Sequence, residues 1–208
     1  MKGAIFDLDG VLVDTAKYHY QAWKRLANSV GVEFSLDDNE HLKGVSRAES
    51  LELILKKGNI EKSAEEKQAL MDVKNEWYLE LAAEMNPDEA LPGAIPFLES
   101  CKERGIKIAL GSSSKNAPMI LERLGITHLF DAIVDGNVVS KSKPDPTVFL
   151  TAAEKLGLTP SECIVFEDAI SGVQAAKTGG FYCVGIGTKE VLPLADEIAT
   201  TLGEYSVR

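Results

Sequence analysis

Asp7 and Asp9 follow a short apolar run, residues 4–6, near the start of the sequence. The run has no helical period and is typical of a strand buried on both faces of a parallel sheet. In an extended chain, residues i and i+2 project to the same side, so both carboxylates can point into one small volume. Such a pair needs a cation nearby or one protonated member. We therefore expect phosphoryl-transfer chemistry, with one carboxylate attacking phosphorus and the other protonating the leaving oxygen.

A structural alternative exists for this pair. Aspartate commonly opens turns and helices, so Asp7 and Asp9 could simply cap the chain segment that follows the strand. An Asp-x-Asp match alone does not separate the two interpretations. Residues elsewhere in the chain that could share a site with this pair are needed to distinguish the two interpretations.

Composition limits the classes of partner. The chain has 208 residues, 22 basic and 32 acidic residues and a net charge of −10, which disfavours binding to nucleic acid or to anionic membranes. An anionic substrate would therefore need a local basic pocket. No apolar run approaches a membrane span of about 20 residues, and no signal-peptide core is present, so a cytoplasmic protein is expected. The spacing of the three cysteines indicates neither a disulfide framework nor a metal site. Nothing in the pattern argues against a monomer.

An all-helical block interrupts the chain after its first strand. Apolar spacing and a Ser-Ala-Glu-Glu capping box predict helices at residues 16–30, 46–57 and 63–85. Little strand signal occurs between residues 15 and 92. Connections in compact domains are usually short, so this block is expected to be a separate cap domain, residues 15–92. The core domain is then residues 1–14 and 93–208.

The core segment alternates strands and helices. We expect strands at 106–110, 132–134, 163–166 and 182–186, with helices between them that end at glycines. This alternation predicts an α/β fold with a doubly wound parallel sheet. The last expected strand ends at residue 186.

Chemically useful residues follow several predicted strands. Ser112 follows the second strand, Lys143 lies in the loop after the third, and Glu167 and Asp168 end the fourth. Ligands in open α/β sheets bind at the carboxyl ends of strands, so these side chains are expected to meet. Each also has a structural alternative: Ser112 as a helix cap, Lys143 as a solvated charge, and the acidic pair as first-turn residues of a helix.

These four segments resemble the four motifs of the haloacid dehalogenase superfamily, and the resemblance covers the whole chain. It implies a Rossmann-like core with an inserted C1-type cap, and Asp9 marks the phosphotransferase branch. By this resemblance Asp7 is the nucleophile, Asp9 the general acid and base, and Ser112 and Lys143 bind the transferring phosphoryl group. Mg²⁺ would be held by oxygen ligands from Asp7, the main-chain carbonyl of Asp9, Glu167 and Asp168.

Further segments are Ala16-Lys-Tyr-His19, Lys43-Gly-Val-Ser-Arg47 and Lys74-Asn75 in the cap, and Ser114-Lys-Asn116 in the core. These segments, together with Trp23, resemble the sugar-phosphate mutase branch of that superfamily. The resemblance implies interconversion of β-D-glucose 1-phosphate and D-glucose 6-phosphate through an aspartyl phosphate and a bisphosphate. Arg47 would hold the second phosphate with its planar fork. The other substrate-binding residues implied are His19, Trp23, Lys43, Gly44, Val45, Ser46, Lys74, Ser114, Lys115 and Asn116.

Alternatives remain open for the cap residues and for the function. Gly44 and Ser46 could form only a turn and a helix cap, Trp23 could belong to the core, and His19 could be structural. The alternative activity is hydrolysis of small sugar phosphates. A non-catalytic sugar-phosphate sensor is disfavoured because Asp7 and Asp168 are both present.

Overall fold

The computed structural model describes residues 1–42 and 45–205, which form two compact units. The large unit contains Met1–Asp14 and the chain from Asn86 onward, and the small unit is Thr15–Met85. The sequence-based boundary lies at residue 92. Lys43 and Gly44, both predicted to bind substrate, lie outside the described residues. No helix among the described residues has both the length and the apolar character needed to cross a membrane.

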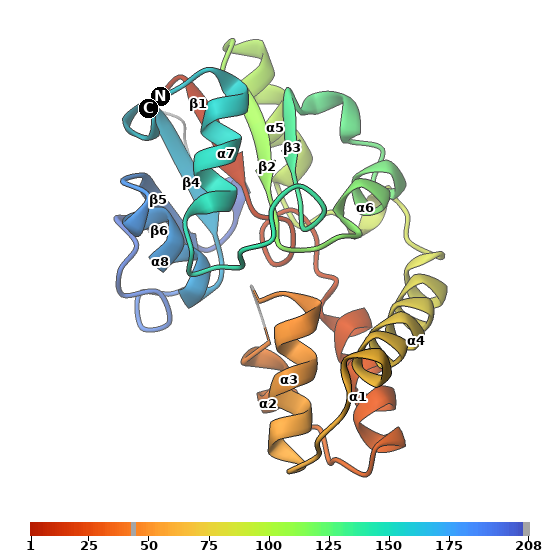
Figure 1. The fold of residues 1–208 in the computed structure, drawn as a ribbon. Coiled ribbons are helices and arrows are strands. Elements are labelled where there is room, and N and C mark those ends of the chain that lie inside the picture. Colours follow the sequence, from red (N-terminus) through yellow and green to blue (C-terminus); the bar gives the residue numbers. More distant parts are fainter. Residues whose placement is uncertain (43–44, 206–208) are drawn as a thin grey trace. The chain divides into compact units, whose positions relative to one another are not determined.

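The large unit is built on a six-stranded parallel sheet in the order β3-β2-β1-β4-β5-β6 (Figure 1). The strands are β1 (Gly3–Phe6), β2 (Lys107–Gly111), β3 (Ala132–Val134), β4 (Cys163–Glu167), β5 (Tyr182–Ile186) and β6 (Glu197–Ala199). The predicted doubly wound parallel sheet is confirmed. Strand β6, which pairs with β5, lies beyond the last strand that the sequence predicts. It has three residues, too few for a periodic signal.

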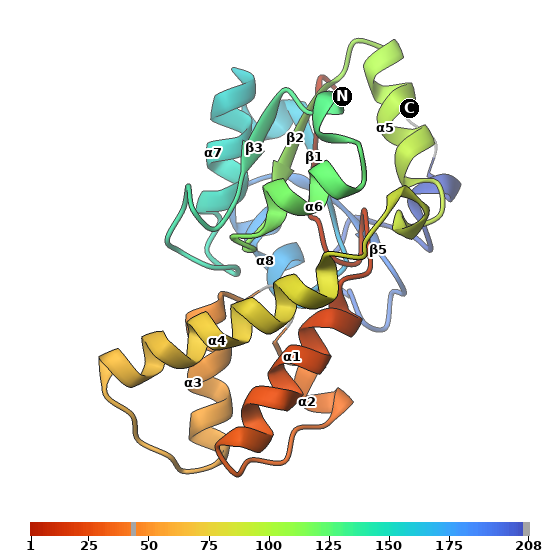
Figure 2. The same ribbon diagram turned by 90° about the vertical axis from the view of Figure 1, so that its right-hand side faces the viewer.

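Helices cover both faces of this sheet. They are α5 (Ala94–Glu103), α6 (Ala117–Arg123), α7 (Thr147–Leu156) and α8 (Ile170–Thr178). Figure 2 shows α7 and α5 on opposite sides of β1 and β2. Short 3₁₀ helices lie at Pro87–Glu89, Thr127–Leu129, Pro160–Glu162 and Leu202–Glu204.

Strand β1 is buried on both faces, which explains its uninterrupted apolar sequence. Ile5 belongs to a cluster with Phe149 of α7 and Val165 of β4. Phe6 faces the other way, stacks on Phe166 at 4.8 Å between ring centroids and meets Phe97 of α5 edge-to-face. With Ile5 and Phe6 held in opposite layers, the end of β1 is fixed where Asp7 begins the loop.

The small unit consists of helices α1 (Ala16–Ser29), α2 (Leu36–Glu40), α3 (Arg47–Lys57) and α4 (Ala64–Ala82). Its core includes Trp23 and Leu26 of α1 and Leu51 and Ile54 of α3, all with exposures of at most 3%. The predicted helices match α1, α3 and α4 within a few residues, because each carries a clear apolar stripe or a capping box.

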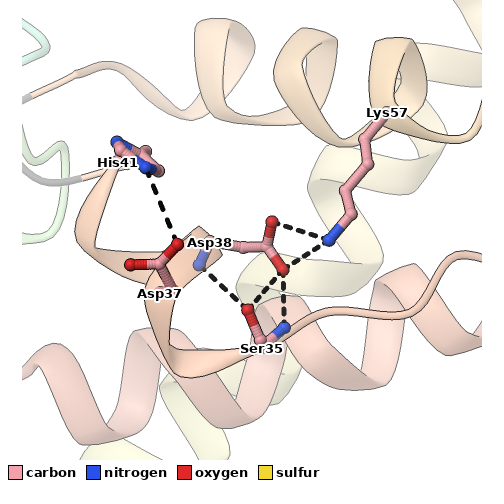
Figure 3. A network of polar contacts seen from close by, with 5 residues as sticks. All are labelled: Ser35, Asp37, Asp38, His41 and Lys57. Atoms are coloured by element: carbon pink, nitrogen blue, oxygen red, sulfur yellow. Dashed lines mark hydrogen bonds and ion pairs between the residues drawn. The ribbon is translucent and has the colours of Figure 1, made fainter.

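Helix α2 was not predicted, because its sequence Leu-Asp-Asp-Asn-Glu has a single apolar residue. It is fixed by polar contacts instead (Figure 3). Asp38 accepts hydrogen bonds from Ser35 N at 2.7 Å and from Lys57 Nζ at 2.5 Å, and Asp38 N donates to Ser35 Oγ. The hydrogen bond from Lys57, followed by those from Ser35, lowers the pKa of Asp38 to about 2. The Lys57 contact thereby ties α3 to the start of α2.

Candidate active site

The sheet register places Asp7 beside the end of β4. Strands β1 and β4 pair in parallel from Gly3 opposite Cys163 to Phe6 opposite Phe166, and Asp7 N donates to Phe166 O at 3.0 Å. The strand order reverses at β1, since β2 and β3 extend to one side and β4 to β6 to the other. Ligand sites of open α/β folds lie at the carboxyl ends of strands around such a reversal.

Lys143 is the centre of the polar cluster at this edge. Its Nζ lies 2.5 Å from Asp7 Oδ1 and 2.6 Å from Glu167 Oε1, and its side chain is fully buried. Burial lowers the pKa of Lys143, but the charges of Asp7 and Glu167 outweigh burial and raise it overall. The alternative that Lys143 is a solvated surface charge is therefore wrong. The cluster keeps a protonated ammonium between two carboxylates.

Glu167 is buried and doubly held. Its Oε1 accepts from Lys143, and its Oε2 accepts from Ala169 N at 2.6 Å at the start of α8. Burial, aided by the charge of Asp7, raises the pKa of Glu167, while Lys143 opposes this shift. The carboxylate thus bridges Lys143 and the helix start.

Two glycines make room for the acidic side chains. A Cβ at Gly172 would lie 1.8 Å from Glu167 Oε1, and a Cβ at Gly10 would lie 2.0 Å from Asp168 Oδ2. Gly10 also has φ +80°, a backbone conformation that other residues rarely adopt. Both positions must therefore lack a side chain for the carboxylates to occupy these places. Sequence reasoning gave Gly172 no role, although it lies one helical turn after the acidic pair.

Asp7, Glu167 and Asp168 form a group that could hold a metal ion. Each offers a carboxylate oxygen, and these three oxygens lie within 4.8 Å of one another. An all-oxygen, anionic set fits a hard divalent cation such as Mg²⁺. Asp9 lies in the loop just beyond, partly buried, and its predicted metal contact was its main-chain carbonyl.

Ser112 directly follows β2 and is 2% exposed. Its Oγ accepts from Ser114 N at 3.1 Å, and Ser114 Oγ accepts from Asn116 N at 3.2 Å. The N-cap residue of α6 is Asn116, so the alternative that Ser112 caps this helix is wrong. Lys115 is exposed in the same loop. The predicted residues Ser112, Ser114, Lys115 and Asn116 thus form one tight turn at the strand-end edge.

In the small unit, Lys74 and His19 form a partly buried pair. Lys74 Nζ lies 2.9 Å from His19 Nδ1, and it also lies over the rings of Trp23 at 4.5 Å and Tyr78 at 4.9 Å. An ammonium can only donate, so His19 Nδ1 accepts and the ring proton is on Nε2. Burial, followed by the charges of Lys74 and Arg47, lowers the pKa of His19 well below its usual value.

Tyr78 completes this group and was missed by sequence reasoning. Its ring stacks on His19 at 4.3 Å between centroids. Its position four residues after Lys74 on α4 is the signal that would have found it, because residues i and i+4 share a helix face.

Arg47 opens α3 and donates to Asn75 Oδ1 at 2.7 Å. Burial lowers the pKa of Arg47, and Asp72 and Tyr78 act against this shift. Ser46 caps α3: its Oγ accepts from Glu49 N and donates to Glu49 Oε2 at 2.8 Å. The structure therefore gives Ser46 the capping role and places Trp23, 3% exposed, in the core. Val45 directly precedes Ser46 and is partly buried.

Comparisons with known proteins agree with this geometry. A family model described as haloacid dehalogenase-like hydrolase matches residues 1–180. The chain is 48% identical to beta-phosphoglucomutase of Bacillus subtilis, over 100% of this chain and 92% of that protein. It is 36% identical to a phosphorylated carbohydrates phosphatase of Thermotoga maritima, over 86% and 82% of the two chains. A solved beta-phosphoglucomutase structure from Clostridium difficile superposes with a TM-score of 0.96 at 41% identity, covering 99% and 93% of the two chains.

Proposed function

Because the chain belongs to the haloacid dehalogenase-like hydrolase family, we propose that it is a phosphomutase interconverting β-D-glucose 1-phosphate and D-glucose 6-phosphate. The observation that carries the mutase proposal is the 48% identity to such an enzyme, which extends over the whole chain and so includes the small unit. The buried cluster of Asp7, Lys143 and Glu167 supports phosphoryl transfer as the reaction type.

We assign the nucleophile to Asp7. Its carboxylate attacks phosphorus, the bond between phosphorus and the sugar oxygen breaks, and an aspartyl phosphate forms. Asp9 gives its proton to the departing sugar oxygen and later takes a proton from the hydroxyl that attacks the aspartyl phosphate. The second transfer regenerates Asp7 and leaves the phosphate on the other sugar position.

Lys143 has a defined part in this scheme. An ammonium carries three protons, and its contacts with Asp7 and Glu167 account for two of them. We assign the third to an oxygen of the transferring phosphoryl group, with Ser112 as a further ligand. A fixed positive charge at that point stabilises the charge that spreads over the phosphoryl oxygens in the transition state.

Asp7, Glu167 and Asp168, with the main-chain carbonyl of Asp9, are proposed to hold Mg²⁺. Bound there, the ion would neutralise charge on the phosphoryl oxygens. Both Glu167 oxygens already accept hydrogen bonds, so Glu167 would share an oxygen with Lys143 or with Ala169 N to serve as a ligand.

The small unit is proposed to act as a cap that favours a sugar hydroxyl over water as the acceptor. Arg47 is proposed to bind the phosphate that is not being transferred, and a bisphosphate held in this way can react at either end. Lys74 and His19, together with Lys43 and Gly44, are proposed to line the sugar side. Trp23, in the core of the small unit, is proposed to act through Lys74, whose Nζ lies over its ring.

A coupled assay tests the proposal. The chain is incubated with β-D-glucose 1-phosphate, Mg²⁺ and a trace of β-D-glucose 1,6-bisphosphate, and D-glucose 6-phosphate is measured through its dehydrogenase while released phosphate is measured in parallel. We expect isomerisation to exceed phosphate release by at least about tenfold, and the D7N variant to show neither reaction. The second candidate, a sugar-phosphate phosphatase, is favoured by the 36% identity to the Thermotoga phosphatase. Phosphate release without isomerisation would select it.

A further inference from the structure

The turn that follows β2, residues 112–116, holds part of its backbone by itself. The hydroxyl groups of Ser112 and Ser114 accept from the amides of Ser114 and Asn116, at 3.1 and 3.2 Å. These two contacts fix the main-chain amides of Ser114 and Asn116 within residues 112–116, the β2–α6 loop. Ser114 O accepts from Ala117 N at 3.4 Å, whereas Lys115 O accepts from a different loop.

The β3–α7 loop, residues 135–146, donates to both carbonyl groups. Gly136 N donates to Ser114 O at 3.3 Å, and Asn137 Nδ2 donates to Lys115 O at 3.0 Å. Two consecutive residues of one loop thus hold two consecutive carbonyls of the other. A Cβ at Gly136 would lie 2.5 Å from Ser113 O and 3.2 Å from Lys115 N, so the approach depends on glycine.

Asp135 fixes the amide of Asn137. Asp135 is 3% exposed, and its Oδ2 accepts from Asn137 Nδ2 at 2.9 Å. Its Oδ1 accepts from Asn137 N at 2.9 Å and Val138 N at 3.2 Å. The two Nδ2 protons of Asn137 therefore go to two different oxygens, one on Asp135 and one on Lys115. The reversed amide would set an oxygen against both acceptors, so only one orientation is compatible with the site.

We propose that Asn137, held by Asp135, is a positioning residue that sets the β2–α6 loop for phosphate binding. The inference rests on the proposed function, because it takes Ser114, Lys115 and Asn116 to bind a phosphate of the sugar substrate. The same loop continues to Lys143, so residues 135–143 connect the backbone that positions Lys115 with the lysine that contacts Asp7. Asn137 acts through Lys115 and touches no reacting atom.

The first test is N137A. Removing one hydrogen bond of ordinary strength from the loop is expected to raise KM for the sugar phosphate about fivefold to tenfold. We expect kcat to change by less than about twofold, because Asp7, Asp9 and Lys143 are untouched. Asn137 is exposed, so the melting temperature should fall by only a few degrees. The matched control is S140A, an exposed position of the same loop, which should leave KM unchanged.

A charge swap separates positioning from stability. In N137D a carboxylate replaces the amide and faces Asp135, so both the melting temperature and the affinity for substrate should fall further than in N137A. In the double variant D135N/N137D the amide of residue 135 can again donate to residue 137, so the melting temperature should recover. KM should stay raised about fivefold to tenfold, since Lys115 O still faces an oxygen.

The outcomes are decisive. A raised KM in N137A that persists in the stable double variant supports the positioning role. A KM within about twofold of wild type in N137A, or a KM that recovers together with the melting temperature in the double variant, overturns it. Neither result bears on the mutase proposal, which fails instead if the wild-type chain does not isomerise the sugar phosphate.

Discussion

Lys143 Nζ and Asp7 Oδ1 lie 2.5 Å apart in the interior of the large unit, although 136 positions separate the two residues in the chain. The side chain of Lys143 is fully buried and that of Asp7 is 9% exposed. A buried ammonium is tolerated only with opposite charges around it, and here Asp7 and Glu167 supply them. This relation links the nucleophile proposed for the reaction to the charge that would stabilise its phosphorylated form.

The first prediction concerns Lys143. In K143M two carboxylates lose their shared cation, so without Mg²⁺ the free energy of unfolding should fall by about 3–5 kcal/mol, measured by urea denaturation. Added Mg²⁺ should restore part of the loss, because it supplies positive charge to the same carboxylates. Turnover of sugar phosphate should fall at least about hundredfold.

The matched control for this prediction is K141M, two positions away. Lys141 is exposed and pairs with Asp145 at 3.4 Å, so its removal should change the free energy of unfolding by less than about 1 kcal/mol. Equal stability of K143M and wild type would contradict the buried pairing.

The second prediction concerns Gly172. In the middle of a solvent-exposed helix, a glycine-to-alanine change raises the free energy of unfolding by about 0.5–1 kcal/mol. At position 172 the new Cβ would lie 1.8 Å from Glu167 Oε1, so G172A should instead destabilise the protein. Displacement of Glu167 should also raise the Mg²⁺ concentration needed for half-maximal activity about tenfold or more.

Urea denaturation and a Mg²⁺ titration of activity measure the two effects of G172A. The control is Q174A, at an exposed position of the same helix, for which neither quantity should change appreciably. If G172A is more stable than wild type and has the same Mg²⁺ dependence, neither stability nor the Mg²⁺ dependence of activity requires the observed position of the Glu167 side chain.

The third prediction concerns Arg47. Replacing the guanidinium in R47A removes a charge-assisted contact with the second phosphate, so the mutase rate should fall about tenfold to a hundredfold. Hydrolysis of a small phosphate ester that has no second phosphate should change by less than about threefold. The mutase rate of R47K should lie between those of R47A and wild type, since lysine keeps the positive charge but lacks the planar guanidinium group.

Asn75 provides a second variant for the same question. Asn75 Oδ1 accepts from Arg47 at 2.7 Å, so N75A should weaken the mutase reaction less than R47A does. If R47A slows isomerisation and simple hydrolysis by the same factor, Arg47 does not bind the second phosphate.

The fourth prediction concerns pH and His19. Its folded-state pKa lies well below the unfolded value of about 6.5, because of burial and of Lys74 and Arg47. Below pH 6.5 the unfolded chain therefore binds a proton that the folded chain does not, and stability is lost as the pH falls. One such group contributes a slope of up to about 1.4 kcal/mol per pH unit.

The variant H19Q should lose this part of the slope between pH 6.5 and 5, measured as the free energy of unfolding in urea. K74M should keep a smaller slope, since burial of His19 remains when the Lys74 charge is gone. An unchanged slope in H19Q would show that the ring of His19 takes up its proton equally well in both states.

The sequence by itself determined the elements whose signals are local. Residues 4–6 are all apolar because a strand in the middle of the sheet is buried on both faces, and Ile5 and Phe6 do pack into opposite layers. The polar residue Asp7 marks the end of this run. The capping box at Ser63 marks the start of α4 because its hydrogen bonds span three residues. The strand-end positions of Ser112 and Glu167 follow from the same short-range patterns.

Only the tertiary structure decided which alternative each polar side chain follows. Lys143 could equally have been a solvated lysine, and its burial between Asp7 and Glu167 depends on strands brought together by the sheet order. Trp23 lies in the core of the small unit, in one cluster with Leu51 and Ile54 of α3. The bond from Asn137 to Lys115 joins two loops through partners 22 positions apart. Periodicity carries no information on such contacts, because they form only when the whole sheet has assembled.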